Sequence, residues 1–380
     1  MKNIKYCTEC VQINSRPGIT FDEHGVCGPC NYFKTLKYID WSIRKEQLHK
    51  HVEWCKGNTS LHGYDCIISV SGGKDSTRQA MFAKDAGLNP LLVSTLSPPE
   101  SINDLALENL DNLNKLGFDI LSVEPSPIVW KKLMRSTFIC EGNYGRATEL
   151  ALYSSAAKIA LAYGIKMIFL GENNSLVYGE DIGGTDGGDA SDMINYNTLG
   201  GGGVSHLIIE HEDVFDNNLF PYQYPEREAL LEAGVKIVYL GYYIENFSNK
   251  DNAEFAIRHG LKTRTDSSED TGGLHNFDAL DDDFVHVNQY MKYLKFGFGK
   301  ATDEVCELIR LGEMSREEGV EILKNIDGKC HQRFIDRFCK YLEIDLSTFV
   351  RVADSFRSKE LWQDMDGVWD QKFKVGEMND

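Results

Sequence analysis

The fold of this 380-residue chain is decided by the stretch Cys66-Ile67-Ile68-Ser69-Val70-Ser71-Gly72-Gly73-Lys74-Asp75-Ser76. Its first five residues form a short apolar run, which indicates a buried strand. Two adjacent glycines follow, and a helical pattern begins at Thr77. A strand, a glycine loop and a helix in this order gather backbone N–H groups at the positive end of a helix dipole. The stretch therefore predicts a phosphate-binding loop.

Four more short apolar runs follow the first one, with helical segments between them. The runs are Leu91–Thr95, Ile120–Val123, Met167–Leu170 and Lys236–Leu240. The helical segments are Ser76–Ala86, Leu105–Leu116, Ile128–Phe138, Thr148–Tyr163 and Asp251–His259. Parallel strands that are buried on both faces give such runs, and the alternation is typical of βαβ units. We expect an α/β fold with a doubly wound, mostly parallel sheet.

The side chains of the loop suit a magnesium-bound polyphosphate. Ser71 and Ser76 supply hydroxyl donors, Lys74 supplies a positive charge, and Asp75 can hold Mg²⁺. Gly72 and Gly73 let the backbone approach an anion closely. The pattern differs from a Walker A loop, in which the lysine is followed by Ser or Thr.

Four cysteines near the N-terminus have the spacing of a metal site. Cys7 and Cys10 form one Cys-x-x-Cys pair, Cys27 and Cys30 form another, and sixteen residues separate the pairs. A closed shell of four thiolates is typical of structural Zn²⁺. An iron–sulfur or redox role and four unrelated buried cysteines are the alternatives. Cys140 precedes a glycine turn, and a lone cysteine is a weak sign of a nucleophile.

Charge and hydropathy disfavour some classes of partner. The chain has 40 Lys and Arg against 58 Asp and Glu, a net charge of −18, which disfavours binding to nucleic acid or to anionic lipid. No apolar run approaches the roughly 20 residues that span a bilayer, and no signal-peptide pattern is visible. We expect a cytoplasmic protein without a nucleic-acid or membrane partner.

The chain is expected to divide into four parts. Residues 1–35 form a zinc-ribbon module, residues 36–63 a helical connector, residues 64–265 the domain with the phosphate loop, and residues 266–380 an acidic loop and a helical C-terminal region. The boundary is placed at the acidic loop Asp266–Asp283. The glycine-rich segment Gly179–Gly203 is either an active-site lid or an irregular surface excursion.

The loop Ser71–Ser76 resembles the signature of the PP-loop ATP pyrophosphatases. The resemblance implies that ATP is the ligand and that the loop holds its β and γ phosphates as the leaving group. A substrate oxygen then attacks the α phosphorus, and the products are an adenylate and pyrophosphate. Lys74 and Asp75 are the implied catalytic residues of the loop.

Two further segments point to the substrate. Gly171, Glu172 and Asn173 end the fourth predicted strand, and in open α/β sheets ligands bind at the carboxyl ends of strands. Glu172 can there orient a nucleophile or a metal ion, and Gly171 can contact the nucleotide. We also select Asn173, Tyr178, Gly179, Lys295 and Lys300 as candidate substrate residues, the last two because they flank Phe296-Gly297-Phe298-Gly299. Arg146 either binds a phosphate or has only a surface role.

Together, these motifs resemble the bacterial N-acetyl sugar amidotransferases over nearly the whole chain. That resemblance implies adenylation of the acetamido oxygen of an N-acetyl sugar, possibly linked to a nucleotide, in lipopolysaccharide or nonulosonic-acid biosynthesis. Ammonia then displaces AMP and leaves an acetamidino group. No glutaminase motif is evident, so a separate glutaminase with a cyclase-like barrel subunit is the implied source of ammonia.

Two other functions remain open at this point. A PP-loop tRNA thiolation enzyme shares the adenylation step and can also begin with paired Cys-x-x-Cys motifs. The acidic charge and the absence of a second Cys-x-x-Cys in the α/β core disfavour it. A zinc-ribbon interaction protein with a degenerate nucleotide fold is the second alternative, and the intact loop Ser71–Ser76 disfavours it.

Overall fold

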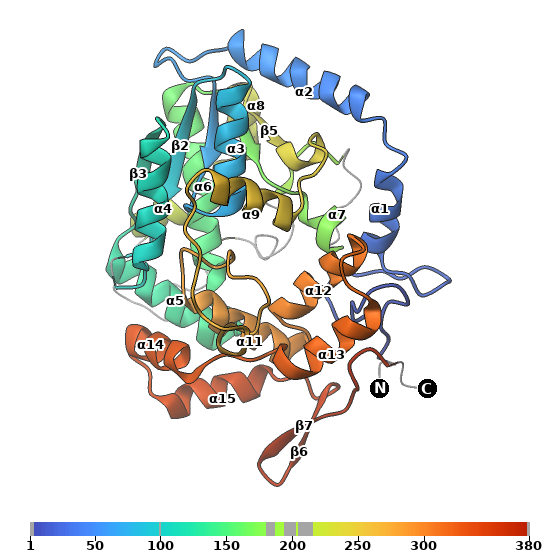
Figure 1. The fold of residues 1–380 in the computed structure, drawn as a ribbon. Helices are drawn as coiled ribbons and strands as arrows, with labels where there is room; N and C mark the ends of the chain where they lie inside the picture. Colours follow the sequence, from blue (N-terminus) through green and yellow to red (C-terminus); the bar gives the residue numbers. More distant parts are fainter. Residues whose placement is uncertain (1–3, 99, 180–186, 194–202, 204–215, 378–380) are drawn as a thin grey trace.

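The structure is a computed structural model and describes residues 4–98, 100–179, 187–193, 203 and 216–377 (Figure 1). Its α-helices are α1 (Gly28–Leu36), α2 (Trp41–Lys56), α3 (Lys74–Asp85), α4 (Asp104–Lys115), α5 (Pro127–Glu141), α6 (Gly145–Tyr163), α7 (Asn174–Tyr178), α8 (Arg227–Glu232), α9 (Asn249–Arg258), α10 (Ser268–Thr271), α11 (Phe284–Phe296), α12 (Lys300–Arg310), α13 (Arg316–Ile326), α14 (Gln332–Leu342) and α15 (Leu346–Phe356). Its strands are β1 (Cys66–Ser69), β2 (Pro90–Thr95), β3 (Asp119–Val123), β4 (Met167–Leu170), β5 (Lys236–Tyr239), β6 (Trp362–Met365) and β7 (Val368–Gln371).

The centre of the molecule is a five-stranded sheet with the order β3-β2-β1-β4-β5. All its pairs are parallel, with Ile67 opposite Leu91 on one side and Ile168 on the other. The chain moves outward from β1 through β2 to β3, and then returns to the other side of β1 for β4. The order of the strands therefore reverses between β1 and β4, which are neighbours at this switch point.

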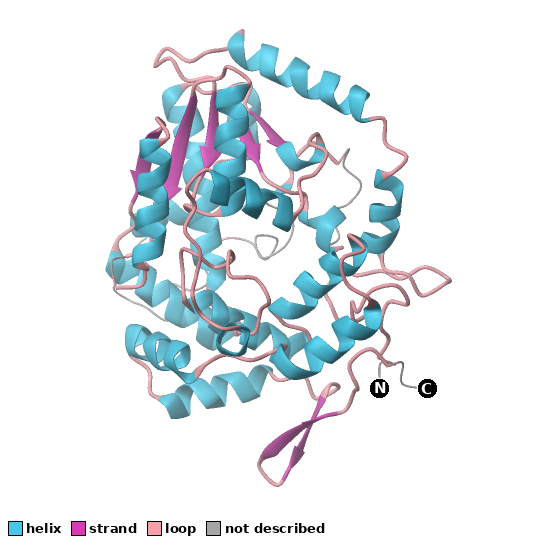
Figure 2. Cartoon of the chain, viewed as in Figure 1, coloured by secondary structure: helices cyan, strands magenta, loops and turns pink. Residues whose placement is uncertain are grey.

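Helices cover both faces of the sheet (Figure 2), and alternate residues of each strand enter two separate cores. Ile67 belongs to a core with residues of α5 and α6, whereas Ile68 belongs to a core with residues of α3 and α4. Burial on both faces explains why the strands are apolar without alternation. The α/β fold and the parallel sheet expected from the sequence are confirmed.

The C-terminal region, which was expected to contain an acidic loop and helices, also contains two strands. Strands β6 and β7 form an antiparallel hairpin that extends from the helices (Figure 1), and Asp366 and Gly367 at its turn both have positive φ, 55° and 87°. An Asp-Gly pair between alternating residues is the usual signal for a two-residue hairpin, and it was present in the sequence.

The cysteine-rich segment packs against the C-terminal helices. Cys7, Cys10, Cys27 and Cys30 share an apolar cluster with Ala301, Val305, Cys306 and Leu323. A module this small cannot bury a core of its own, and here α12 and α13 supply the missing surface.

Two other expectations concern residues that the structure describes only in part. Of the glycine-rich segment Gly179–Gly203, residues 180–186 and 194–202 lie outside the described residues, so the choice between lid and surface excursion is not addressed. Across the described ranges, no helix is both long enough and apolar enough to cross a bilayer.

Two helix C-caps provide a test of packing against the last helix of the fold. Gly142 after α5 and Gly164 after α6 both have left-handed φ, 59° and 65°. A Cβ at Gly142 would lie 2.7 Å from the ring of Phe356, whereas a Cβ at Gly164 would meet no atom within 4 Å. Gly164→Ala should cost about 1 kcal/mol from the backbone alone, and Gly142→Ala roughly 2–4 kcal/mol because overpacking is added.

Urea unfolding of both variants measures the difference. Equal losses of unfolding free energy in the two variants would contradict the packing of α15 against this cap.

Candidate functional site

The loop Ser71–Ser76, which the sequence predicts to bind phosphate and which is here called the phosphate loop, joins β1 directly to α3. Gly72 has a φ of +83°, and a Cβ there would lie 3.1 Å from Ala106 O and 3.2 Å from Leu110 N of α4. Both the backbone conformation and the close approach of α4 therefore require glycine. Gly73 is the N-cap of α3, and the side chains of Ser76 and Thr77 donate hydrogen bonds back to its carbonyl oxygen.

A cavity of about 270 Å³, here called the loop cavity, opens beside this loop at the switch point. The carboxyl ends of β1 and β4 both reach it, as expected for a ligand site in a doubly wound sheet. Its lining residues include Ser71, Gly73, Asp75 and Ser76 of the loop, Gly171 and Glu172 after β4, and Tyr153, Met193 and Tyr239.

A second cavity of about 420 Å³, here called the aromatic cavity, lies next to the first. Its walls combine rings with amide and charged groups, which is the composition of a small-molecule pocket. They include Tyr32, Phe33, Trp41, Tyr242 and Phe247, together with Asn173, Asn249, Asn252, Glu307 and Arg310.

Asp75 and Glu172 line both cavities and mark the place where they meet. Asn252 Nδ2 donates to Asp75 Oδ1 at 2.9 Å, and Lys74 Nζ lies 3.0 Å from Asp75 Oδ2. Two carboxylates at one junction offer the hard oxygen ligands that Mg²⁺ prefers, so Asp75 and Glu172 fit a magnesium site.

Burial raises the pKa of Glu172 to about 7, and the neighbouring charge of Asp75 adds to the rise. The Lys74 ammonium opposes this shift, and Glu307 contributes to it. A carboxyl group with a pKa near neutrality can exchange a proton with a reacting group under physiological conditions.

The Lys74 ammonium does not line either cavity, although the sequence suggested that it contacts phosphates. It is buried, and its Nζ lies 2.6 Å from Asp278 Oδ1 in addition to its contact with Asp75. Burial alone would lower the pKa of Lys74, but the charges of Asp75 and Asp278 raise it well above its usual value. Lys74 is therefore a fixed cation beneath the loop.

Asp278, like most residues that line the aromatic cavity, was not identified as a site residue from the sequence. It belongs to the acidic loop Asp266–Asp283, and it contacts Lys74 of the loop Ser71–Ser76. Asp278 Oδ2 lies 2.8 Å from Lys300 Nζ, so one carboxylate joins Lys74 to Lys300. A run of acidic residues is usually a solvated surface, and no local pattern distinguished Asp278 from its neighbours.

The remaining predicted residues lie at different places. Gly171 lines the loop cavity, and Asn173 and Tyr178 line the aromatic cavity. Gly179 instead lies against the cysteine-rich segment, where a Cβ would be 2.6 Å from Ile19 Cδ1. Lys295 lines neither of these two cavities, and its Nζ donates to Glu141 O at 2.8 Å.

Two residues that the sequence left open also lie elsewhere. Arg146 pairs with Glu141 at 3.2 Å, and Cys140 is exposed. Neither lines the loop cavity or the aromatic cavity.

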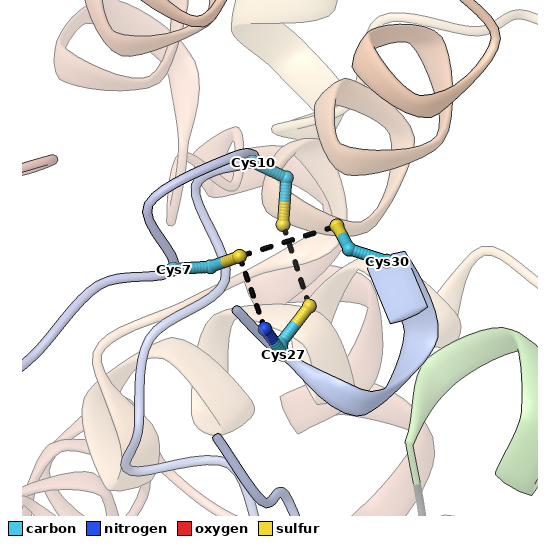
Figure 3. A group of neighbouring side chains, drawn as sticks. All are labelled: Cys7, Cys10, Cys27 and Cys30. Atoms are coloured by element: carbon cyan, nitrogen blue, oxygen red, sulfur yellow. Dashed lines mark hydrogen bonds between the residues drawn. The ribbon is translucent and has the colours of Figure 1, made fainter. Parts of the chain in front are cut away.

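Cys7, Cys10, Cys27 and Cys30 converge on one point (Figure 3), and their sulfur atoms all lie within 4.8 Å of one another. Cys7 Sγ is 4.0 Å from Cys30 Sγ, and Cys10 Sγ is 3.7 Å from Cys27 Sγ. A tetrahedral Zn²⁺ with Zn–S bonds of about 2.3 Å needs sulfur separations of about 3.8 Å. The four buried thiols thus fit a closed structural zinc site, as the spacing predicted.

The cysteine cluster and the aromatic cavity share one helix. Cys27 is the N-cap of α1, Cys30 lies in its first turn, and Tyr32 and Phe33 of the same helix line the cavity. Arg310 of α12 also lines it and donates from Nη1 to Val177 O of α7 at 3.1 Å. Metal bound by the cysteines would fix the start of α1 and, with it, one wall of the cavity.

Comparisons with known proteins give two similarities. Residues 271–375 match the family of the LPS biosynthesis protein WbpG-like, C-terminal domain. Among solved structures, the chain is similar to a predicted subunit of tRNA methyltransferase from Methanocaldococcus jannaschii, with 16% identity and a TM-score of 0.27 over 50% of this chain and 75% of that chain. Among curated proteins, none shows significant similarity to this chain.

The metal site predicts a specific effect of removing one thiolate. Purified protein should contain about one Zn²⁺ per chain, and Cys27→Ser should lose it and unfold at a lower temperature, because the site is closed and structural. Elemental analysis and thermal unfolding measure the two effects. Cys140→Ser, a change at an exposed cysteine, is the control and should alter neither. A fully stable Cys27→Ser protein without zinc would contradict the structural role.

Proposed function

We propose that this chain is an ATP-dependent amidotransferase that converts the acetamido group of an N-acetyl sugar to an acetamidino group. The observation that carries the proposal is the junction of two cavities at Asp75 and Glu172. One cavity is lined by a phosphate loop, and the other by aromatic and amide side chains that suit a ring-shaped, hydrogen-bonding acceptor. The match of residues 271–375 to an LPS biosynthesis family supports a substrate from surface-glycan synthesis.

In this proposal ATP occupies the loop cavity, and the acceptor occupies the aromatic cavity. The backbone amides of Gly72 and Gly73 and the N-terminus of α3 face the phosphates and stabilise the charge of the departing pyrophosphate. Asp75 would hold Mg²⁺, which would neutralise charge on the phosphates when bound. The acceptor oxygen would approach the α phosphorus across the junction.

The chemistry proceeds in two steps. The acetamido oxygen forms a bond to the α phosphorus, and the bond from that phosphorus to the bridging oxygen breaks, releasing pyrophosphate. Ammonia then adds to the activated carbon, AMP leaves with the former amide oxygen, and a proton is lost. Glu172 is the candidate to accept that proton, because its raised pKa keeps it close to half ionised near pH 7.

Ammonia must reach the adenylate before water does. We propose that a separate glutaminase with a cyclase-like barrel subunit supplies it, and that ATP, Mg²⁺ and structural Zn²⁺ are the cofactors. The cavity walls contributed by Tyr32, Tyr242 and Phe247 would limit the access of water to the junction.

The proposed function is tested by measuring pyrophosphate and AMP release with ATP, Mg²⁺ and an ammonium salt. A panel of UDP-linked and free N-acetyl sugars, with deacylated sugars as controls, identifies the acceptor. Release that depends on both an acetamido sugar and ammonia, with a product about one mass unit lighter, supports the proposal. If no sugar works and unmodified tRNA triggers AMP release, the tRNA-modification function replaces it.

Removing the charge of Asp75 should abolish turnover without affecting the fold. Asp75 is partly exposed at the junction, so Asp75→Asn should lower the rate by roughly 100-fold or more, since a metal ligand and transition-state charge are lost. Steady-state release of AMP measures the rate. The zinc content and thermal midpoint should stay at wild-type values, and undiminished turnover would remove Asp75 from the mechanism.

The pH dependence follows from Glu172. Because its pKa lies near 7, the ionised fraction increases as pH rises through neutrality, and the ammonia-dependent rate should increase to a plateau above about pH 8. Assays with a fixed concentration of free ammonia separate this effect from the ionisation of ammonium. Glu172→Gln should lower the rate and remove the neutral limb, and an unchanged profile would contradict the assignment.

A further inference from the structure

We propose that Asp278 and Lys300 are positioning residues, which hold the Asp75 carboxylate at the junction of the two cavities through Lys74. The contacts form a series of alternating charges, Lys300–Asp278–Lys74–Asp75, here called the charge series. Its successive N–O distances are 2.8, 2.6 and 3.0 Å. This proposal rests on the nucleotide site proposed above. It assigns to the segment that matches the WbpG-like family a part in completing that site.

The charge series ends at Asp75, which lies at the junction of the two cavities. Asp75 Oδ2 is held by Lys74, and its Oδ1 accepts from Asn252 Nδ2 at 2.9 Å. Both oxygens of the carboxylate therefore have fixed partners, and its orientation is set before a ligand arrives. A metal ligand fixed in this way gains affinity, because less freedom is lost on binding.

The two lysines of the charge series require an ionised Asp278 between them. Lys74 and Lys300 are the first residues of α3 and α12, where a cation meets the unfavourable end of the helix dipole. Glu304 Oε1 lies 3.9 Å from Lys300, but burial raises the pKa of Glu304 to about 8, so it is mostly protonated near pH 7. Asp278 is then the ionised partner that offsets the two ammonium groups.

The acidic loop is built to place Asp278. Arg264 donates to Ala279 O at 2.5 Å, to Asp266 Oδ2 at 2.9 Å and to Asp283 Oδ1 at 2.6 Å, which ties the loop together on both sides of Asp278. Ala279 has a φ of +51°, a conformation that non-glycine residues seldom adopt. Such backbone strain is maintained where the surroundings fix a residue for a purpose.

In the competing interpretation, Lys74 and Lys300 contact phosphate directly. The phosphates of bound ATP would then replace the Asp278 carboxylate as the partner of the two lysines. Two observations favour positioning. Neither lysine lines the loop cavity or the aromatic cavity. The first amides of α12 are also engaged, because Gly299 N and Thr302 N donate to Asp327.

Lys300→Met tests the positioning role of the charge series, and Lys292→Met is its matched control. Lys292 pairs with Asp303 at 2.8 Å in the same C-terminal part, and the exposed fractions of the two lysines are similar, 22% and 24%. The Lys292 pair does not reach the phosphate loop. We expect Lys300→Met to raise the Mg²⁺ concentration for half-maximal turnover, and to lower kcat, by roughly 10- to 100-fold.

The KM for the acceptor should stay within about threefold in Lys300→Met, because the aromatic cavity is unchanged. Lys300→Arg should recover most of the Mg²⁺ dependence, since it keeps the charge. Lys292→Met should leave the Mg²⁺ dependence at the wild-type value. Asp278→Asn removes the carboxylate that two buried cations share, so the double variant Asp278→Asn with Lys300→Met, which keeps the net charge, is measured beside it.

Calorimetric titration with Mg²⁺ and the non-cleavable α,β-methylene analogue of ATP separates the two proposals. If the wild-type protein does not bind the analogue, the proposed nucleotide site fails. If it binds and Lys300→Met has wild-type Mg²⁺ dependence, or if the double variant binds the analogue more tightly than wild type, the positioning role alone is overturned. A higher Mg²⁺ requirement in Lys300→Met and in the double variant, with rescue by Lys300→Arg, supports the positioning role.

Discussion

The direct passage from β1 into α3 through two glycines is the constraint on which the rest of the structure depends. The left-handed φ of Gly72 and the 3.1 Å approach to Ala106 O leave no room for a side chain, so α3 begins immediately beyond the sheet. That geometry fixes Lys74 and Asp75 as the first two residues of a helix at the switch point. Glu172, which follows β4, then lies across the same opening.

Placing charged side chains at this point has an energetic consequence. A buried ammonium without a partner is strongly destabilising, and a chain of alternating charges removes that penalty only if each member is held in place. Asp278 meets the requirement because Arg264 ties its loop together. Asp278 thus makes the acidic loop Asp266–Asp283 part of the charged centre.

The site also depends on parts of the chain that are far apart in sequence. The aromatic cavity receives Tyr32 from α1, Tyr178 from α7, Asn252 from α9 and Arg310 from α12. Cys27 is the N-cap of α1 and Cys30 lies in its first turn, so a metal bound by the cysteines would stabilise one wall of the cavity together with the fold. Structural and functional roles are therefore difficult to separate in the N-terminal segment, because the same helix serves both.

The sequence by itself determined the features that depend on local chemistry. Apolar runs gave the parallel strands within one or two residues, the spacing of Cys7, Cys10, Cys27 and Cys30 predicted their convergence, and the glycines of residues 71–76 predicted the loop. The hairpin of β6 and β7 was also accessible through its Asp-Gly turn. Only the tertiary structure decided which charges meet. It joined Asp278 to Lys74, 204 residues away, and to Lys300, and it paired Lys295 with Glu141 instead. Side-chain pairs between separate elements leave no periodicity or spacing in the sequence.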